Sequence, residues 1–171
     1  MKKYYYWFML VCMAALVSCS SSTSRLDQYH AEKHQQDSVA LVEQQRTLVY
    51  YQGQLDSLVQ VADSLLPLFQ YEKNEKYEDA GYYVVESRSG LRVKVRDDGH
   101  RPVLVYREGK RLEGDPESMG LNENERTMVE RGEHLAIVIS DMRQFEQLIQ
   151  QTNGKINMYQ LRLERQDNAQ Q

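Results

Sequence analysis

The chain has 171 residues and a formal net charge of −4, from 21 lysines and arginines and 25 acidic side chains. This length suits one domain, or one helical rod that carries a small head. The acidic balance argues against general nucleic-acid binding, and the scarcity of glycine (9) and proline (3) favours long helices over a compact β fold.

The first 19 residues combine a basic start, an apolar run and a cysteine preceded by a small residue. Lys2 and Lys3 precede an apolar and aromatic run over residues 4–17, which is shorter than the ~20 residues that span a bilayer as a helix. The run ends in Leu16-Val17-Ser18-Cys19, and this segment resembles the lipobox of bacterial lipoprotein signal peptides. The resemblance implies that residues 1–18 are removed and that acyl chains, palmitate among them, are attached to Cys19. An uncleaved anchor or an ordinary secretory signal is the alternative.

The same resemblance implies a location. Ser20 follows Cys19, whereas an Asp at that position commonly retains lipoproteins of this kind in the inner membrane. We therefore expect a lipid-anchored protein on the periplasmic face of the outer membrane, with residues 19–24 as the lipidated cysteine and a short tether. Each buried methylene adds ~0.8 kcal/mol to anchoring, so two or more acyl chains make the attachment effectively permanent. Both cysteines lie in this segment, which argues against a disulfide framework.

Residues 25–77 are predicted to form a first long helix. Apolar side chains recur every seven residues, which is typical of a helix packed against another helix; they are Leu41, Leu48, Leu55, Ala62 and Phe69. Further apolar residues widen this stripe and indicate contact with more than one neighbour; they are Val42, Val49, Val59 and Leu66. Pro67 predicts a kink near the helix end.

Toward the start of this helix the seam positions become polar and include His34 and Asp37. This change indicates a frayed end, a shifted register or cover by another chain. His30 and His34 lie four residues apart and therefore on one helix face, as a helical metal pair would. The sequence places no third ligand beside them, so we predict a solvated surface and no metal site.

Residues 78–115 are predicted to form a β head, a meander of three to four strands. Residues 91–96 alternate strictly between apolar and basic side chains, which places Leu91, Val93 and Val95 on one face and Arg92, Lys94 and Arg96 on the other. Asp97-Asp98-Gly99-His100 is typical of a hairpin turn.

The β head is locally basic. Between Arg88 and Arg111 there are eight basic and three acidic side chains. We therefore identify a candidate docking patch for an acidic partner or an anionic polymer; its residues are Arg92, Lys94, Arg96 and Arg107. A solvated sheet face, whose charges discourage edge pairing, is the plainer alternative.

Residues 116–165 are predicted to form a second long helix, followed by a disordered tail over 166–171. A row of large aliphatic residues repeats every seven positions; it is Met128, Leu135, Met142, Ile149, Ile156 and Leu163. The apolar, β-branched run over 135–139 also fits a buried strand, and we favour the helix because the repeat continues through Gly132 and Gly154. Phase matching of two antiparallel helices places Leu48 near Ile149.

These patterns together predict a mainly α fold with a small β insert, in which an antiparallel, coiled-coil-like hairpin of long helices carries the β head. The layout resembles periplasm-facing coiled-coil lipoproteins of bacteria. No motif assembles an acid, a base and a nucleophile, so we expect neither an enzyme nor a cofactor.

Two functions fit the sequence. The first is a structural or adaptor lipoprotein with an envelope protein as partner and with homo-oligomers as a further option. The second is a ligand-binding lipoprotein whose basic β face holds peptidoglycan or another anionic polymer.

Overall fold

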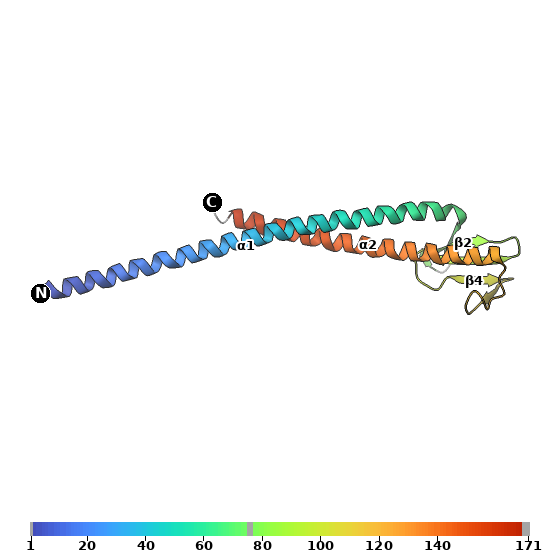
Figure 1. The fold of residues 1–171 in the computed structure, drawn as a ribbon, viewed down its shortest axis with the longest axis horizontal. Helices are drawn as coiled ribbons and strands as arrows, with labels where there is room; N and C mark the ends of the chain where they lie inside the picture. Colours follow the sequence, from blue (N-terminus) through green and yellow to red (C-terminus); the bar gives the residue numbers. More distant parts are fainter. Residues whose placement is uncertain (1, 75–76, 169–171) are drawn as a thin grey trace. The chain divides into compact units, whose positions relative to one another are not determined.

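The computed structural model describes residues 2–74 and 77–168, and it describes side chains for 25–74 and 81–168. In chain order these residues form α1 (Lys2–Leu65), the short 3-10 helix η1 (Leu66–Leu68), five strands and α2 (Glu123–Asn168) (Figure 1). The strands are β1 (Gln70–Asn74), β2 (Tyr77–Glu86), β3 (Leu91–Arg96), β4 (Leu104–Arg107) and β5 (Lys110–Leu112). The expected mainly α fold with a β insert is confirmed, with five strands instead of three to four.

The chain divides into two compact units, which are described separately below. The helical unit consists of residues 1–47 and 152–171, and the sheet unit consists of residues 48–151. Cys19 and the predicted signal peptide lie in residues 1–24, outside the part whose side chains are described. In the part of the chain that the structure covers, no helix combines the length and the apolar character that a membrane crossing requires.

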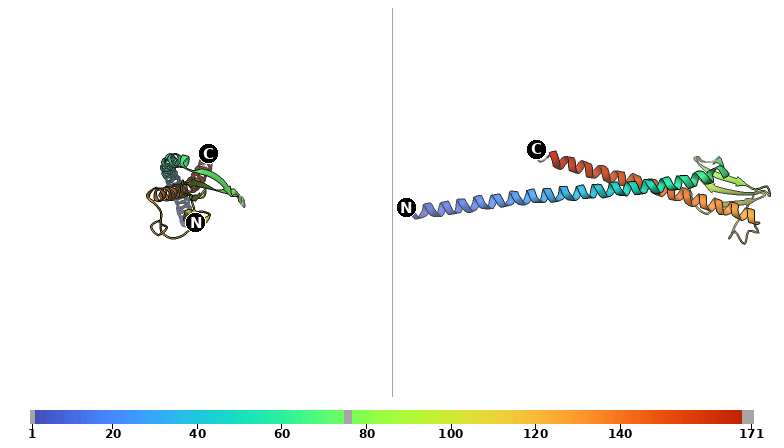
Figure 2. Two further views of the ribbon diagram at one scale, coloured as in Figure 1. Left: turned by 90° about the vertical axis from the view of Figure 1, so that its right-hand side faces the viewer. Right: turned by 45° about the horizontal axis from the view of Figure 1, so that its top comes forward.

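The sheet unit contains one antiparallel sheet, in which each strand pairs with its neighbours in sequence, in the order β1-β2-β3-β4-β5. The sheet lies beside the first part of α2 (Figures 1 and 2). We call the face that packs on α2 the inner face and the opposite face the outer face. The inner face is apolar because the side chains of β3 alternate: Leu91, Val93 and Val95 are fully buried.

Two apolar clusters join the inner face to the helices. The first combines Leu91, Val93 and Val105 with Val129 of α2 and with Leu121 in the preceding loop. The second combines Phe69 and Val95 with Leu135 and Ala136 of α2. Burial of these side chains is the main stabilising contribution to the sheet unit, because each large aliphatic side chain contributes roughly 1.5–3 kcal/mol when fully buried.

Gly132 allows α2 to approach the sheet closely. A Cβ atom at this position would lie 2.9 Å from a methyl carbon of Val93 and 3.4 Å from one of Val95. Gly99, in the turn after β3, has a φ of +68°, and its Cβ would lie 2.5 Å from the Ser140 amide nitrogen. Both glycines are therefore required where the sheet and the turn contact α2.

The run over residues 135–139 is helical, as expected, within the continuous helix α2. Leu135 and Ala136 are fully buried and Val138 is nearly so. The apolar, β-branched character of this run therefore reflects burial from more than one side, since the same segment meets the sheet and belongs to the row that repeats every seven residues.

The first helix ends earlier than expected. α1 ends at Leu65, and Pro67 lies in η1, after which Phe69 adopts an extended conformation with φ −120° and ψ 151°. Proline lacks the backbone donor that a helix needs and disfavours helical geometry in the residue before it. The expected kinked helix over 25–77 is thus wrong beyond Leu65, and residues 70–74 form β1, so the β head begins before residue 78.

The second helix begins later than expected. α2 starts at Glu123 and not at 116, because residues 113–122 form a loop in which Gly114 and Gly120 have positive φ. Asn122 and Glu125 form a capping box, in which each side chain accepts a hydrogen bond of 3.0 Å from the backbone amide of the other. At the other end, α2 continues through residues 166–168 of the expected tail, and 169–171 lie outside the described residues.

The two helices contact each other within each unit. In the sheet unit the rings of Tyr51 and Phe145 lie 5.9 Å apart, which agrees with the register that places Leu48 near Ile149. In the helical unit the polar seam of α1 meets polar residues of α2. Asp37, which is buried, accepts a hydrogen bond of 3.0 Å from Gln166 and lies 3.8 Å from Arg162. Polar partners on α2 thus account for two polar seam positions of α1, Asp37 and His34.

Candidate functional site

The outer face of the sheet holds three of the four residues of the candidate docking patch. Arg92, Lys94 and Arg96 alternate with the buried residues of β3, as expected. Arg107 does not join them. It pairs in register with Leu91, whereas Tyr106 pairs with Arg92, so Arg107 belongs to the inner face. The patch as expected is therefore corrected to these three residues, with Tyr106 in the place of Arg107.

Arg92 is paired with an acid from β1. Its guanidinium donates a hydrogen bond to Glu72. Glu72 lies opposite Tyr82, and Arg92 lies opposite Glu86, so this ion pair runs diagonally across β2 and over Val84. Val84 is only 5% exposed although it belongs to the outer face. Its burial is consistent with its position beneath this ion pair, since long charged side chains cover apolar surface with their methylene groups.

Lys94 lies between two tyrosine rings. Its Nζ atom is 5.5 Å from the ring centroid of Tyr82 and 5.9 Å from that of Tyr106. The same atom lies 3.6 Å from Oε2 of Glu72. These distances allow cation–π attraction from both rings, which is strongest where the cation is partly removed from water. The Lys94 side chain is 24% exposed and lies on the middle strand of the outer face.

Arg96 is paired with an acid from the following turn. Its guanidinium donates to Oδ2 of Asp98 at 2.5 Å, and the His100 amide donates to Oδ1 at 2.9 Å. Partial burial alone would raise the pKa of the Asp98 carboxyl, but the hydrogen bonds from His100 and Arg96 outweigh it, so the pKa lies below its ordinary value. Asp98 is therefore ionised at neutral pH and offsets the charge of Arg96.

The outer face is consequently close to neutral in spite of its basic sequence. Each of the three cations has an acidic partner from its own chain, and Arg111 on β5 lies 3.8 Å from Glu113. Glu72 lies outside the basic stretch of the sequence and within residues that were expected to be helical. Its role followed only from the pairing of β1 with β2. The sequence signal that was available is Pro67, which breaks the helix before this acid.

A pocket of about 430 Å³ opens on the outer face between the β2–β3 and β4–β5 turns. Its lining combines two cations, two acids, one tyrosine and two glycines; they are Glu86, Gly90, Arg92, Lys94, Tyr106, Glu108 and Gly109. No atom lies within 4 Å of the place where a Cβ would stand at Gly90 or Gly109. Because these two lining residues lack side chains, they do not narrow the opening of the pocket. Glu108 has a φ of 51° at the β4–β5 turn, which is uncommon for a residue other than glycine. The outer face is therefore concave at this pocket, and two tyrosine rings flank Lys94 beside it.

Arg107 connects the inner face to the start of α2. Its guanidinium donates to Oε2 of Glu125 at 2.8 Å, and the Ser89 hydroxyl donates to Oε1 at 2.6 Å. The bonds from Ser89 and from the Asn122 amide, with the charge of Arg107, lower the pKa of the Glu125 carboxyl against the opposing effect of burial. Glu125 thus links β4, the β2–β3 turn and α2 through one buried carboxylate.

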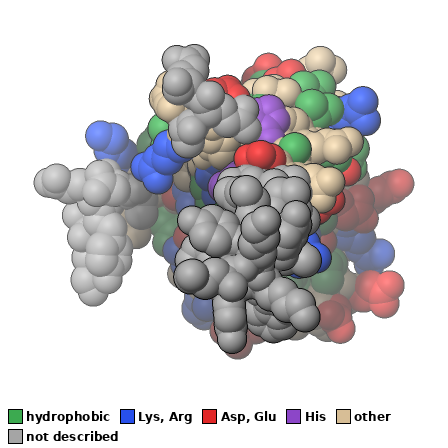
Figure 3. Space-filling model, turned by 90° about the vertical axis from the view of Figure 1, so that its left-hand side faces the viewer, with side chains coloured by type: hydrophobic (Ala, Val, Ile, Leu, Met, Phe, Trp, Pro, Cys, Tyr) green, Lys and Arg blue, Asp and Glu red, His purple; other side chains and the backbone are tan. Residues whose placement is uncertain are grey.

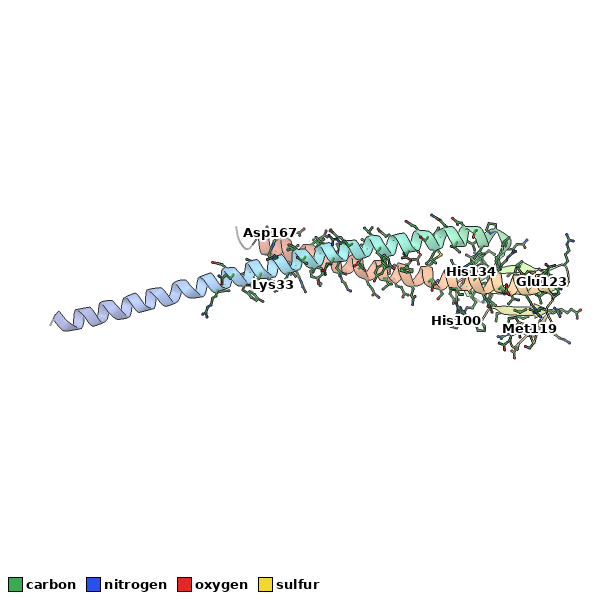
Figure 4. All side chains as sticks on the ribbon, in the orientation of Figure 1. Lys33, His100, Met119, Glu123, His134 and Asp167 are labelled. Atoms are coloured by element: carbon green, nitrogen blue, oxygen red, sulfur yellow. The ribbon has the colours of Figure 1, made fainter. Side chains whose placement is uncertain are left out.

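The described histidines lie in different parts of the chain. Nε2 of His34 lies 3.2 Å from Oδ1 of Asp167, and Figure 4 shows Asp167 on α2 and Lys33 on α1 on neighbouring stretches of the helical unit. His100 and His134 are exposed on the turn after β3 and on α2 (Figure 4). Among the described residues no group of three or more potential ligands could hold a metal ion. In Figure 3, described basic and acidic side chains are interspersed on the visible face.

Comparison with known proteins gives no relative from which a role could be transferred. No protein-family model, curated protein or solved structure shows a significant match to this chain.

Proposed function

We propose that this protein is a lipid-anchored component of the bacterial envelope that serves as a structural or adaptor protein. In this proposal Cys19 carries the lipid, and the outer face of the sheet docks onto a second envelope protein. The anchor is supported by the Leu16-Val17-Ser18-Cys19 lipobox. The proposal assigns no catalytic step and no cofactor to the chain.

The observation that carries the proposal is the arrangement of Lys94 between Tyr82 and Tyr106 on a face whose cations are already paired. Tyrosine and arginine are enriched at protein interfaces, where they combine large contact area with hydrogen bonding. Side chains that are fixed before binding lose little conformational entropy when a partner docks. The ion pairs and ring contacts of the outer face support its use as a protein-binding surface.

The same geometry supports the polymer-binding alternative less well. Long-range attraction of an anionic polymer requires a surface with a net positive charge. On the outer face, Glu72 and Asp98 offset most of the charge of Arg92, Lys94 and Arg96. Only a partner that displaces these acids would gain the full attraction of the cations.

Crosslinking in intact cells tests the proposal. A photoreactive amino acid is placed at Tyr106 in the anchored, full-length protein, and the matched control carries it at Glu130, an exposed position on α2. We expect the probe at Tyr106 to capture one envelope protein that the probe at Glu130 does not capture. Capture should persist when the salt concentration of the medium rises, because the face is nearly neutral.

Two results would contradict the proposal. One is equal capture by both probes. The other is salt-sensitive cosedimentation of the full-length protein with purified cell-wall polymer, together with no protein captured at Tyr106; this result would favour the polymer-binding function.

The anchor has its own test. Replacing Cys19 by Ala removes the sulfur that the lipobox is expected to present for acylation. We expect the variant to lose incorporation of labelled palmitate completely and to remain at the size of the precursor on gels. Replacing Ser20 by Ala serves as the control and should leave labelling unchanged. Labelling of the Cys19→Ala variant at the parent level would contradict the lipobox interpretation.

A further inference from the structure

Two pockets of the sheet unit share one acid. The pocket of about 430 Å³ on the outer face and a second pocket of about 280 Å³ are both lined by Glu86. The second pocket also touches Leu68 of η1, Gln70 and Glu72 of β1 and two valines of β2. Leu68 is 45% exposed, so this end is partly apolar. The two pockets therefore meet at Glu86 and together extend from the start of β1 to the β4–β5 turn.

The larger pocket contains two acids that have no partner within the described part of the chain. Arg92 lies opposite Glu86 in the register of β2 and β3, but its guanidinium donates a hydrogen bond to Glu72 instead. Glu108 lines the pocket from the β4–β5 turn. Both Glu86 and Glu108 are exposed, and among the described residues neither side chain forms an ion pair or a hydrogen bond. Their carboxylates are therefore accessible to a ligand.

The charges that line the larger pocket favour a cation as its occupant. The two acids balance the two cations of the lining, Arg92 and Lys94. Glu72, which is bonded to Arg92 and lies 3.6 Å from Lys94, adds one further negative charge. Arg88 and Lys110 are close in sequence to the same turns but do not line the pocket. A ligand with one positive charge would thus neutralise the pocket, whereas an anion would compete with Glu72 for both cations.

Tyr106 makes the pocket suitable for the side chain of a basic residue. A cation within ~6 Å of a tyrosine ring centroid is attracted to the ring, and Lys94 already uses this ring at 5.9 Å. Lysine and arginine also have methylene groups, which pack along an aromatic surface while the charged end reaches a polar group. Hydrogen bonds from such a charged end to carboxylates are stronger than those between neutral groups. The ring and the two acids together therefore match a lysine or arginine side chain.

We propose that the larger pocket binds a lysine or arginine side chain of the partner protein, carried by an extended segment that continues over the smaller pocket. The proposal rests on the proposed function and specifies the chemistry of the partner at the outer face. The ammonium or guanidinium group donates hydrogen bonds to Glu86 and Glu108 and lies beside the ring of Tyr106. A charge enclosed in a pocket is screened by salt less than an exposed one, which agrees with the salt resistance expected of capture.

Nuclear magnetic resonance with model peptides tests the ligand class. The full-length protein is labelled with ¹⁵N on its nine glycines, of which Gly90 and Gly109 line the pocket. The probe is an acetylated and amidated alanine pentapeptide with one central lysine, and its matched control has norleucine at that position. We expect the lysine peptide to shift the amide signals of Gly90 and Gly109 at least about tenfold more than the control peptide. The signal of Gly154 on α2 should stay unchanged.

Two double variants show whether the acids of the pocket are responsible. Glu86→Gln with Glu108→Gln should abolish the response to the lysine peptide. Glu133→Gln with Glu146→Gln removes the same charge from exposed positions on α2 and should respond like the parent. Equal responses to both peptides, or a full response of the Glu86→Gln, Glu108→Gln variant, would overturn the inference. A response to putrescine as large as that to the lysine peptide would assign the pocket to a small free cation and would also overturn it.

Capture in cells separates this inference from the proposed function. The aromatic photoreactive residue at Tyr106 keeps a ring in the pocket, and it is combined with each double variant in the anchored, full-length protein. We expect Glu86→Gln with Glu108→Gln to lower capture at least about tenfold and the Glu133→Gln, Glu146→Gln control to leave it unchanged. Capture at the parent level in the first variant would overturn the inference and leave the adaptor function standing. A response to the lysine peptide without any capture in the parent would support the ligand class and overturn the adaptor function.

Discussion

The two faces of the sheet, which share the same strands, are organised in different ways. On β3 the inner residues Leu91, Val93 and Val95 are fully buried against α2, whereas the outer residues Arg92, Lys94 and Arg96 remain partly exposed and engage in ion pairs and ring contacts. The inner face stabilises the fold through area removed from water. The outer face contributes little to stability, because exposed ion pairs are worth about 0–1 kcal/mol each.

Under the proposed function, this difference separates residues for stability from residues for docking within one strand of six residues. Substitutions on the inner face should change the free energy of unfolding and leave partner capture intact in whatever fraction remains folded. Substitutions on the outer face should do the reverse. The following variants test that separation in order of expected effect on stability.

The largest effect is expected from Val93→Asp. This change places a carboxylate at a fully buried position among valines and beside Gly132, where it has no partner, at a cost of several kcal/mol. We expect the sheet unit to unfold, with loss of the near-ultraviolet circular dichroism of its tyrosines. Lys94→Gln, one position along on the outer face, should keep the parent spectrum. A folded Val93→Asp protein would mean that the inner face is not buried.

The next effect concerns Glu125, whose carboxylate joins three elements. Replacing it by Gln removes a buried charge from Arg107 and Ser89 and should cost about 2 kcal/mol at pH 7. In the parent, the lowered pKa means that the carboxylate stabilises the fold fully above its ordinary value of 4.5 and that this stability is lost as pH falls through the native pKa.

Urea unfolding at several pH values measures both effects. Between about pH 7 and pH 3 the parent should lose more stability than Glu125→Gln, which has no carboxyl to titrate at this position. Glu123→Gln, in the same helical turn but exposed, should behave like the parent. Equal acid sensitivity of parent and Glu125→Gln would exclude Glu125 as a source of the pH dependence.

Smaller effects on the free energy of unfolding are expected from substitutions of two glycines in α2. The two effects should have opposite signs. Gly132→Ala places a methyl group 2.9 Å from Val93 and should destabilise the sheet unit by about 1 kcal/mol, since overpacking exceeds the gain in helix propensity. Gly154→Ala meets open space and should stabilise α2 by up to ~1 kcal/mol. Urea midpoints that move in the same direction for both variants would contradict the close approach of α2 to β3.

The smallest effect on stability is expected from the outer face. Replacing Arg92, Lys94 and Arg96 together by Gln should change the free energy of unfolding by only about 0.5 kcal/mol, because all three groups are partly exposed. The same variant should nevertheless lose the protein captured by a probe at Tyr106. Normal folding together with unchanged capture would leave these residues as a solvated surface only.

Much of the fold could be predicted because two periodicities are strong. The seven-residue repeat over 128–163 correctly predicted a continuous helix across residues 135–139 and across Gly132 and Gly154. The alternation with period two over 91–96 correctly assigned both faces of β3. Arg107 was predictable too, since period 2 within β4 places it on the face of Val105, which is buried. The prediction nevertheless placed Arg107 in the docking patch, because the surrounding stretch has an excess of basic residues.

The strand β1 could not be predicted in the same way. Gln70-Tyr71-Glu72-Lys73-Asn74 shows no apolar alternation, and Phe69 continues the sevenfold repeat of α1. The segment is a strand because of distant partners: Tyr71 pairs with Tyr83 and donates a hydrogen bond of 3.0 Å to Asp97. Such tertiary pairing overrides local propensity. Because β1 was not predicted, Glu72 was not placed beside the basic residues of β3. The nearly neutral charge of the outer face was therefore not predicted either.

The strand order has a consequence for how the chain folds during its synthesis. Every strand pairs with its neighbour in sequence, so the sheet can form through local contacts as soon as residue 112 is available. Its apolar inner face, however, is covered by residues 121–136, which follow later in the chain. Because the chain is made from its N-terminus, the sheet is complete before its cover, and its valines can aggregate until the first four turns of α2 have been made.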